Sequence, residues 1–183
     1  MTPANSSDNP SILSKNVEEF NNKILTLTII NGKRGFKDES GNIVIPAQYD
    51  LAHDFSEGLA AVLKDGKWGF IDKSNNVKIP IIYDDAYSFS DGLALVKKGV
   101  KYGFIDKSGN VKVPFIYDDA WIFSEGLALV EKGWKSGFID KSGNIKIPLI
   151  YDYADDFSEG LAPVEKDGKT GKVDKNGNVT WDE

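Results

Sequence analysis

Cysteine is absent from the 183-residue sequence, and histidine occurs once, at His53. Without cysteine the protein has no disulfide, no thiolate nucleophile and no cysteine-bound zinc. A single histidine also excludes zinc sites that need two imidazoles. Long apolar stretches are missing too, since no segment approaches the roughly 18 consecutive apolar residues that a membrane-spanning helix needs. We therefore expect no metal site of these kinds and no membrane span.

Basic residues are outnumbered by acidic ones, 22 to 28, which gives a net charge of −6. Binding to nucleic acids or acidic membranes depends on Lys and Arg that neutralise phosphates, so this balance argues against nucleic-acid partners and favours a basic one. The first ten residues are polar and lack the apolar core of a signal peptide. We expect a cytoplasmic protein if the sequence begins at the native start, and a secreted or periplasmic one if a signal peptide was removed.

Five columns of residues recur every 34 positions without an insertion. They are Gly35, Gly69, Gly103, Gly137 and Gly171; Pro46, Pro80, Pro114 and Pro148; Tyr49, Tyr83, Tyr117 and Tyr151; Phe55, Phe89, Phe123 and Phe157; and Gly58, Gly92, Gly126 and Gly160. A fixed period of this size indicates a tandem repeat whose units pack on their neighbours. Helical tetratricopeptide repeats have the same period, but proline and glycine at fixed places and short apolar segments exclude helices here.

The turns between these short segments predict β-hairpins. At the first turn of a unit, three tips suit type I′ and two, with glycine first, suit type II′. The type I′ tips are Asn31-Gly32, Asp65-Gly66 and Asp167-Gly168, and the type II′ tips are Gly99-Val100 and Gly133-Trp134. The second turn, residues 106–110, is typical of a type I turn with Gly109 in the left-handed conformation, for which Asn75 substitutes in the second unit.

The predicted fold is therefore all-β, with five three-stranded meanders joined by linkers. The meanders span 25–46, 59–80, 93–114, 127–148 and 161–181, within an array that covers 24–183. Units of ~34 residues are short beside the four-stranded blades of propellers, which favours an open twisted superhelix over a closed five-bladed ring. Within residues 1–23 and at Ile24, apolar residues fall at helical spacing, so this segment is either a short cap helix or a disordered tail.

The residues 66–72, Gly-Lys-Trp-Gly-Phe-Ile-Asp, and 55–60, Phe-Ser-Glu-Gly-Leu-Ala, resemble the motif of the WG-repeat (KWG-repeat) family. The resemblance covers residues 25–181. Its tryptophan survives only at Trp68, and the equivalent places hold Arg34, Tyr102, Ser136 and Thr170. The family has no established catalytic residues, so the resemblance implies a binding role and leaves the ligand open.

Carboxylates are the remaining candidates for catalysis, for example Asp84-Asp85 after Tyr83. A catalytic pair should be singular, whereas these residues recur from unit to unit. Recurrence favours a structural role, in which the carboxylate accepts backbone N–H bonds in the linker. The lysine columns alternate with aspartates, which favours a solvated strand face over an anion-binding stripe. His53 occupies a variable position that we expect to be exposed. We predict no enzyme activity, no catalytic residue and no cofactor.

Binding residues are expected where the units differ, because shared positions build the scaffold. Large aromatic side chains gather at such positions in the central units: Tyr87, Trp121, Trp134, Tyr102 and Trp68. Aromatic residues provide hot spots for protein partners and platforms for sugar rings. We favour a protein partner, with a glycan or cell-wall polymer as the alternative. For Trp68 and Tyr102, filling the gap between neighbouring meanders is an equally good interpretation.

Overall fold

The computed structural model describes residues 23–183, which form 19 β-strands and no helix. The first sheet contains β1 (Thr26–Ile30), β2 (Lys33–Lys37) and β3 (Ile43–Tyr49). The second contains β4 (Leu51–Ala52), β5 (Ala60–Lys64), β6 (Lys67–Ile71) and β7 (Val77–Tyr83). The third contains β8 (Asp85–Ala86), β9 (Leu93–Lys98), β10 (Lys101–Asp106) and β11 (Val111–Tyr117). The fourth contains β12 (Asp119–Ala120), β13 (Ala128–Lys132), β14 (Lys135–Ile139) and β15 (Ile145–Tyr151). The fifth contains β16 (Tyr153–Ala154), β17 (Leu161–Lys166), β18 (Lys169–Asp174) and β19 (Val179–Trp181).

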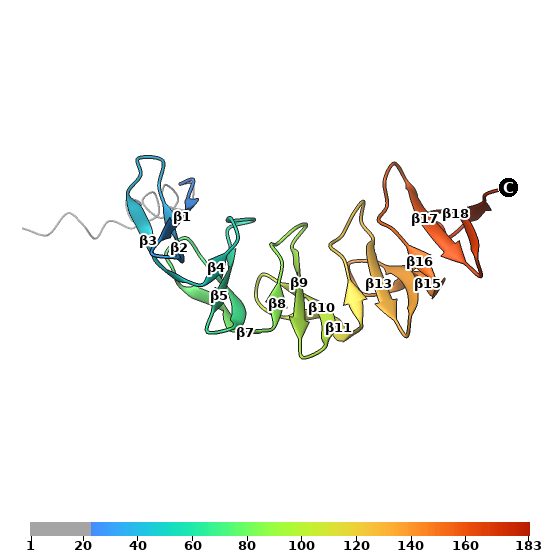
Figure 1. Cartoon of the computed structure of the whole chain (residues 1–183), viewed down its shortest axis with the longest axis horizontal. Helices are drawn as coiled ribbons and strands as arrows, with labels where there is room; N and C mark the ends of the chain where they lie inside the picture. Colours follow the sequence, from blue (N-terminus) through green and yellow to red (C-terminus); the bar gives the residue numbers. More distant parts are fainter. Residues whose placement is uncertain (1–22) are drawn as a thin grey trace, which may run out of the picture.

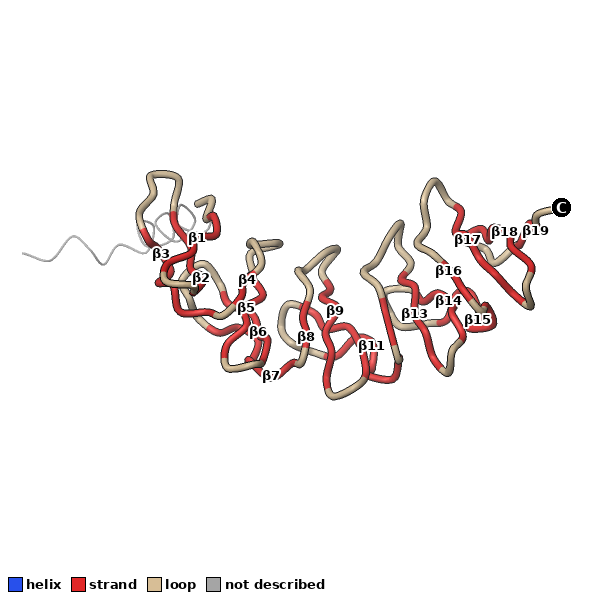
Figure 2. The backbone as a smooth tube through the Cα atoms, in the orientation of Figure 1, coloured by secondary structure: helices blue, strands red, loops and turns tan. Residues whose placement is uncertain are grey.

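The sheets follow one another along an open, curved row, with the first and the fifth at opposite ends (Figure 1). Strands and loops alternate in a similar order in successive units (Figure 2). The predicted all-β fold and the open arrangement of five repeats are confirmed, because the five antiparallel sheets are separate and none closes into a barrel. The segment predicted as a cap helix or tail lies almost wholly outside the described residues.

A fourth strand joins four of the five meanders, which the sequence did not predict. It has two residues, lies in the preceding linker and pairs with the first strand of the next meander, as Ala86 does with Val96. The third strand also continues past its proline to the recurring tyrosine, for example from Val111 to Tyr117. A two-residue strand is too short to leave an alternating pattern of apolar residues, so periodicity could not reveal it.

The recurring strand glycine is required by a close backbone approach. The register between β10 and β11 shifts on either side of Phe104, so the third strand bulges over Gly103. A Cβ atom at Gly103 would lie 2.6 Å from the carbonyl oxygen of Val113. The proline column follows from the same edge position, because an edge strand tolerates a residue without an N–H and is protected by it from pairing with another chain.

Most of the turns have the predicted geometry. Gly109 and Asn75 have φ angles of 81° and 64°, both in the left-handed region. Gly99 has a φ of 65° and Val100 lies outside the positive region, as a type II′ tip requires. The prediction for Gly133-Trp134 is wrong. Both residues have positive φ angles, 59° and 63°, so this tip has type I′ geometry with tryptophan where glycine is expected.

Neighbouring sheets pack face to face, so the central strands are apolar on both faces. In the second sheet, Ile71 packs toward the first sheet and Phe70 toward the third. The linker phenylalanine after each sheet covers the middle-strand phenylalanine of that sheet. The centroid separations are 4.7 Å for Phe36–Phe55, 4.9 Å for Phe70–Phe89, 4.8 Å for Phe104–Phe123 and 4.8 Å for Phe138–Phe157.

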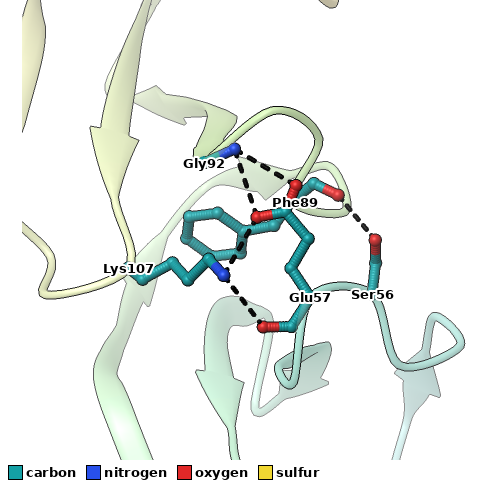
Figure 3. A network of polar contacts seen from close by, with 5 residues as sticks. All are labelled: Ser56, Glu57, Phe89, Gly92 and Lys107. Atoms are coloured by element: carbon teal, nitrogen blue, oxygen red, sulfur yellow. Dashed lines mark hydrogen bonds and ion pairs between the residues drawn. The ribbon is translucent and has the colours of Figure 1, made fainter.

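Polar contacts tie the first linker to the second (Figure 3). The Ser56 hydroxyl donates to the Phe89 carbonyl at 2.6 Å, and the Glu57 carboxylate accepts from the Gly92 N–H at 3.1 Å. Lys107, from the third unit, pairs with Glu57 Oε2 at 3.1 Å. Contacts of this kind recur where Lys175 pairs with Glu125. They link units along the array, and the candidate sites lie in the gaps between the sheets.

Candidate binding groove

A groove between the third and fourth sheets brings together three of the five predicted binding residues. We call it the aromatic groove. Its volume is about 340 Å³, and it is lined by Tyr87, Leu95 and Tyr102 from the third sheet and by Asp119, Ala120, Trp121 and Ile122 from the fourth. The short strands β8 and β12 position its two edges. The Tyr87 N–H donates to the Leu95 carbonyl, and the Trp121 N–H donates to the Leu129 carbonyl, both at 3.0 Å.

The aromatic groove is partly open to solvent and mostly apolar. Tyr87 is 40% exposed and Trp121 is 36% exposed, while Tyr102 is half-buried with the Lys97 ammonium 4.9 Å above its ring. Burial raises the pKa of the Tyr87 phenol, and the negative charge of Asp85 adds to this rise. Like an ordinary phenol, the Tyr87 side chain is neutral at physiological pH. The groove offers ring faces, a phenol and one carboxylate to a ligand.

Trp134 lies beside this groove, at the tip of the β13–β14 hairpin. It is 92% exposed and lines a second hollow of about 350 Å³ with Asp118, Asp119 and Glu131. We call this the Trp134 hollow. Asp119 lines both the aromatic groove and the Trp134 hollow, so the two are adjacent.

Trp68 is placed differently from the other candidates. It is only 8% exposed and packs in the apolar cluster between the second and third sheets. Its ring lies 4.9 Å from that of His53, and both line a hollow of about 580 Å³ between the first and second sheets. This hollow lies at the position equivalent to that of the aromatic groove, two repeat units earlier in the chain. The expectation that His53 is exposed is wrong, because its ring is half-buried against Trp68.

The recurring linker aspartates hold the hairpin tips. Asp84 accepts the Gly99 N–H at 2.7 Å and pairs with Lys67, and Asp118 does the same with Gly133 at 2.8 Å and with Lys101. These partners hold the pKa of both carboxyls below the usual range, chiefly through the lysine hydrogen bonds. Within residues 23–183, no three acidic or histidine side chains are grouped so that they could hold a metal ion. No helix in this part of the chain is long and apolar enough to cross a membrane.

The sequence profile of the WG containing repeat matches residues 35–68, 68–102, 102–135 and 137–169. The chain belongs to the WG-repeat family. Its matched residues include Trp68, Tyr87, Tyr102, Trp121 and Trp134, so every predicted binding residue lies within the WG repeats. No curated protein matches the sequence.

Solved structures resemble the WG-repeat array in fold alone. Kluyveromyces lactis Hsv2 aligns with a TM-score of 0.51 and 10% identity, over 87% of this chain and 60% of that chain. A eukaryotic initiation factor aligns with a TM-score of 0.54 and 12% identity, over 87% of this chain and 52% of that chain. These β-propeller-like neighbours are longer, since the WG-repeat array spans 60% and 52% of their lengths.

Sequence reasoning missed four residues of the aromatic groove: Leu95, Asp119, Ala120 and Ile122. A signal existed for two of them. The column of Asp119 reads Leu51, Asp85, Asp119 and Tyr153, and the column of Ile122 reads Asp54, Ser88, Ile122 and Asp156. Both columns vary from unit to unit, as the columns of the predicted aromatic residues do. A column whose polarity varies between units indicates a binding position just as an aromatic residue at a variable position does. A search for large aromatic side chains alone does not find such columns.

Proposed function

We propose that this WG-repeat array is a non-catalytic module that binds a protein partner, and that a side chain of the partner enters the aromatic groove. One observation carries the proposal. Tyr87, Tyr102 and Trp121 come from two different sheets and from two variable columns, yet they line one open hollow. The recurring Phe104–Phe123 pair already fills the core beside them. The fold therefore does not need all three aromatic residues at this place.

The size and chemistry of the groove fit a side chain. Its volume of about 340 Å³ is near the lower end of binding pockets, roughly 300–1000 Å³. Tyrosine and tryptophan supply large contact areas with few rotatable bonds, so little conformational entropy is lost when they are covered. Burial of the exposed Ile122 side chain would add to the affinity, and Asp119 would select for a donor or a cation.

A glycan is the second candidate, because the partly exposed indole of Trp121 lies beside the Asp119 carboxylate. A sugar ring could stack on the indole while a hydroxyl donates to the carboxylate. Titration with oligosaccharides of cellulose, chitin and peptidoglycan, monitored by tryptophan fluorescence, tests this candidate. Saturable quenching that disappears in Trp121→Ala would favour a glycan over a protein.

The main experiment is a selection from an unbiased library of displayed dodecapeptides against the full chain. Synthetic copies of the selected peptides are then measured by calorimetry against Trp121→Ala and Tyr102→Ala. We expect each variant to weaken binding by about tenfold or more, as hot-spot residues do. Trp181→Ala is the matched control, because Trp181 is 39% exposed and lies in the fifth sheet, outside the groove. Selected peptides that bind both groove variants as tightly as they bind the unaltered chain would refute the proposed site.

A further inference from the structure

The backbone at Trp134 is unusual for a tryptophan. Three of the other four tips hold glycine at the equivalent place, and Gly32, Gly66 and Gly168 have φ angles of 78°, 77° and 75°. Trp134 adopts the same left-handed conformation with a φ of 63°. A large side chain in this region is strained, and strain of this kind is typical of functional sites. Packing does not explain the residue either, since its side chain is 92% exposed.

The carboxylates of the Trp134 hollow are only partly occupied by internal partners. Asp118 pairs with Lys101 and accepts the Gly133 N–H, which fixes the tip that carries Trp134. Asp119 uses Oδ1 to accept the Ala120 N–H, and Glu131 uses Oε1 to accept from the Ser136 hydroxyl at 3.1 Å. Within residues 23–183, no donor contacts Asp119 Oδ2 or Glu131 Oε2, and neither carboxylate has an ion pair. The hollow therefore holds two carboxylates that have no ion pair with a described residue, beside an exposed indole.

An indole face and two carboxylates are complementary to an organic cation. The ring quadrupole attracts a guanidinium or ammonium group placed over its face, and the carboxylates supply acceptors at its edge. An anionic or purely apolar group would leave both charges unmatched. The net charge of −6 also attracts a basic partner.

We propose that the partner segment carries an arginine or lysine side chain that binds in the Trp134 hollow, next to the side chain that enters the aromatic groove. This inference rests on the proposed function and specifies the chemistry of the partner. Asp119 connects the two hollows, so one continuous segment can fill both. The aromatic groove then supplies apolar contact area, and the Trp134 hollow selects a basic residue at one fixed position of the segment.

The peptides selected from the displayed library test this inference. We expect a basic residue at a constant distance from an aromatic or apolar residue in the selected sequences. Replacing that basic residue by glutamine should weaken binding by about tenfold, as the loss of a cation–π contact with its carboxylates would. Trp134→Gly and Glu131→Gln should each weaken the basic peptide and leave the glutamine peptide unaffected, because neither residue lines the aromatic groove.

Val100→Gly is the matched control, because Val100 holds the equivalent tip position of the third unit and is 77% exposed. This variant should bind the basic peptide normally. Thermal melting of Trp134→Gly establishes that the variant folds. Peptides that depend on Trp121 but lack a basic residue, and that bind Trp134→Gly unchanged, would overturn this inference while the proposed function stands. Peptides that ignore Trp121 altogether would refute the proposed function itself.

Discussion

Lys37 in β2 and Lys172 in β18 interrupt two core columns of the repeat, one in the first sheet and one in the fifth. Lys37 occupies the repeat position at which Ile71 and Ile105 of the next two units are buried against the preceding sheet. Lys172 occupies the repeat position at which Phe104 of the third unit is buried against the following sheet. A closed ring would bring these two ammonium groups into one apolar interface, at an effective cost of several kcal/mol per ion. This pair therefore favours the open row of sheets over a ring.

The first prediction concerns this polar end face. Lys172→Phe should place an exposed ring on the outer face of the fifth sheet and cause association that depends on protein concentration. Sedimentation velocity measures this association directly. Lys169→Phe, at the exposed tip of the same sheet, is the control with the same composition and should remain unassociated. Equal association of both variants would show that Lys172 does not protect the end of the array.

The second prediction concerns the strand glycine. Gly103→Ala should lower the free energy of unfolding by about 1–3 kcal/mol, because the added methyl group meets backbone that cannot move aside. Gly109→Asn should cost less than ~1 kcal/mol, since asparagine tolerates the left-handed region and already occupies it at Asn75. Denaturant unfolding measures both. A harmless Gly103→Ala would contradict the close approach to Val113.

The third prediction separates core from surface in one linker. Phe123 is 8% exposed and packs on Phe104, so Phe123→Ala should cost about 3–5 kcal/mol. Trp121 is 36% exposed, so Trp121→Ala should cost less, roughly 1–2 kcal/mol. Chemical denaturation of both variants checks the difference. Equal losses of stability would make Trp121 a core residue and remove it from the proposed binding surface.

The fourth prediction follows from the strain at Trp134. Trp134→Gly should raise the free energy of unfolding by about 0.5–1 kcal/mol, because glycine adopts a positive φ without strain. Val100→Gly should lower it by a similar amount, since Val100 has no positive φ to relieve and glycine adds entropy to the unfolded chain. Opposite shifts in the two melting temperatures are expected. A destabilising Trp134→Gly would mean that the indole supports the fold.

The fifth prediction concerns pH. The Asn110 side chain donates to Asp106 and holds the pKa of that carboxyl below its usual range, and Asn144 does the same for Asp140. A lowered pKa in the folded state gives stability that is present above the unfolded value of about 3.9 and is lost as pH falls. Burial raises the pKa of Tyr117 and Tyr151, so their contribution is lost as pH rises beyond about 10.

Melting temperatures measured across the pH range should therefore show a plateau between about pH 4 and pH 10. The variant Asp140→Asn should flatten the acid side of this profile, because it removes one carboxyl that must be protonated. If the melting temperature of Asp140→Asn falls at acid pH as steeply as that of the unaltered chain, and Asp-to-Asn variants at the equivalent turns behave in the same way, these aspartates have no such role.

Local chemistry made most of the fold predictable. The turn glycines and asparagines and the recurring phenylalanines each depend on contacts within one unit or between neighbours, and those contacts repeat every 34 residues. The Gly133-Trp134 tip was mispredicted because glycine at the first position is compatible with both turn types, and only the tryptophan at the second position argued for type II′.

The sequence alone determined the repeat, the all-β class and the residues that vary between units, because period and composition are properties of the chain itself. It also contained Lys37 and Lys172, but their role at the ends of the array can be recognised only once the direction in which the sheets stack is known. Tertiary structure alone decided that Tyr87, Tyr102 and Trp121 share one groove while Trp68 is buried between sheets. The physical reason is that these columns meet across the face-to-face contact of neighbouring sheets, and the spacing of those sheets is set by the apolar side chains packed between them.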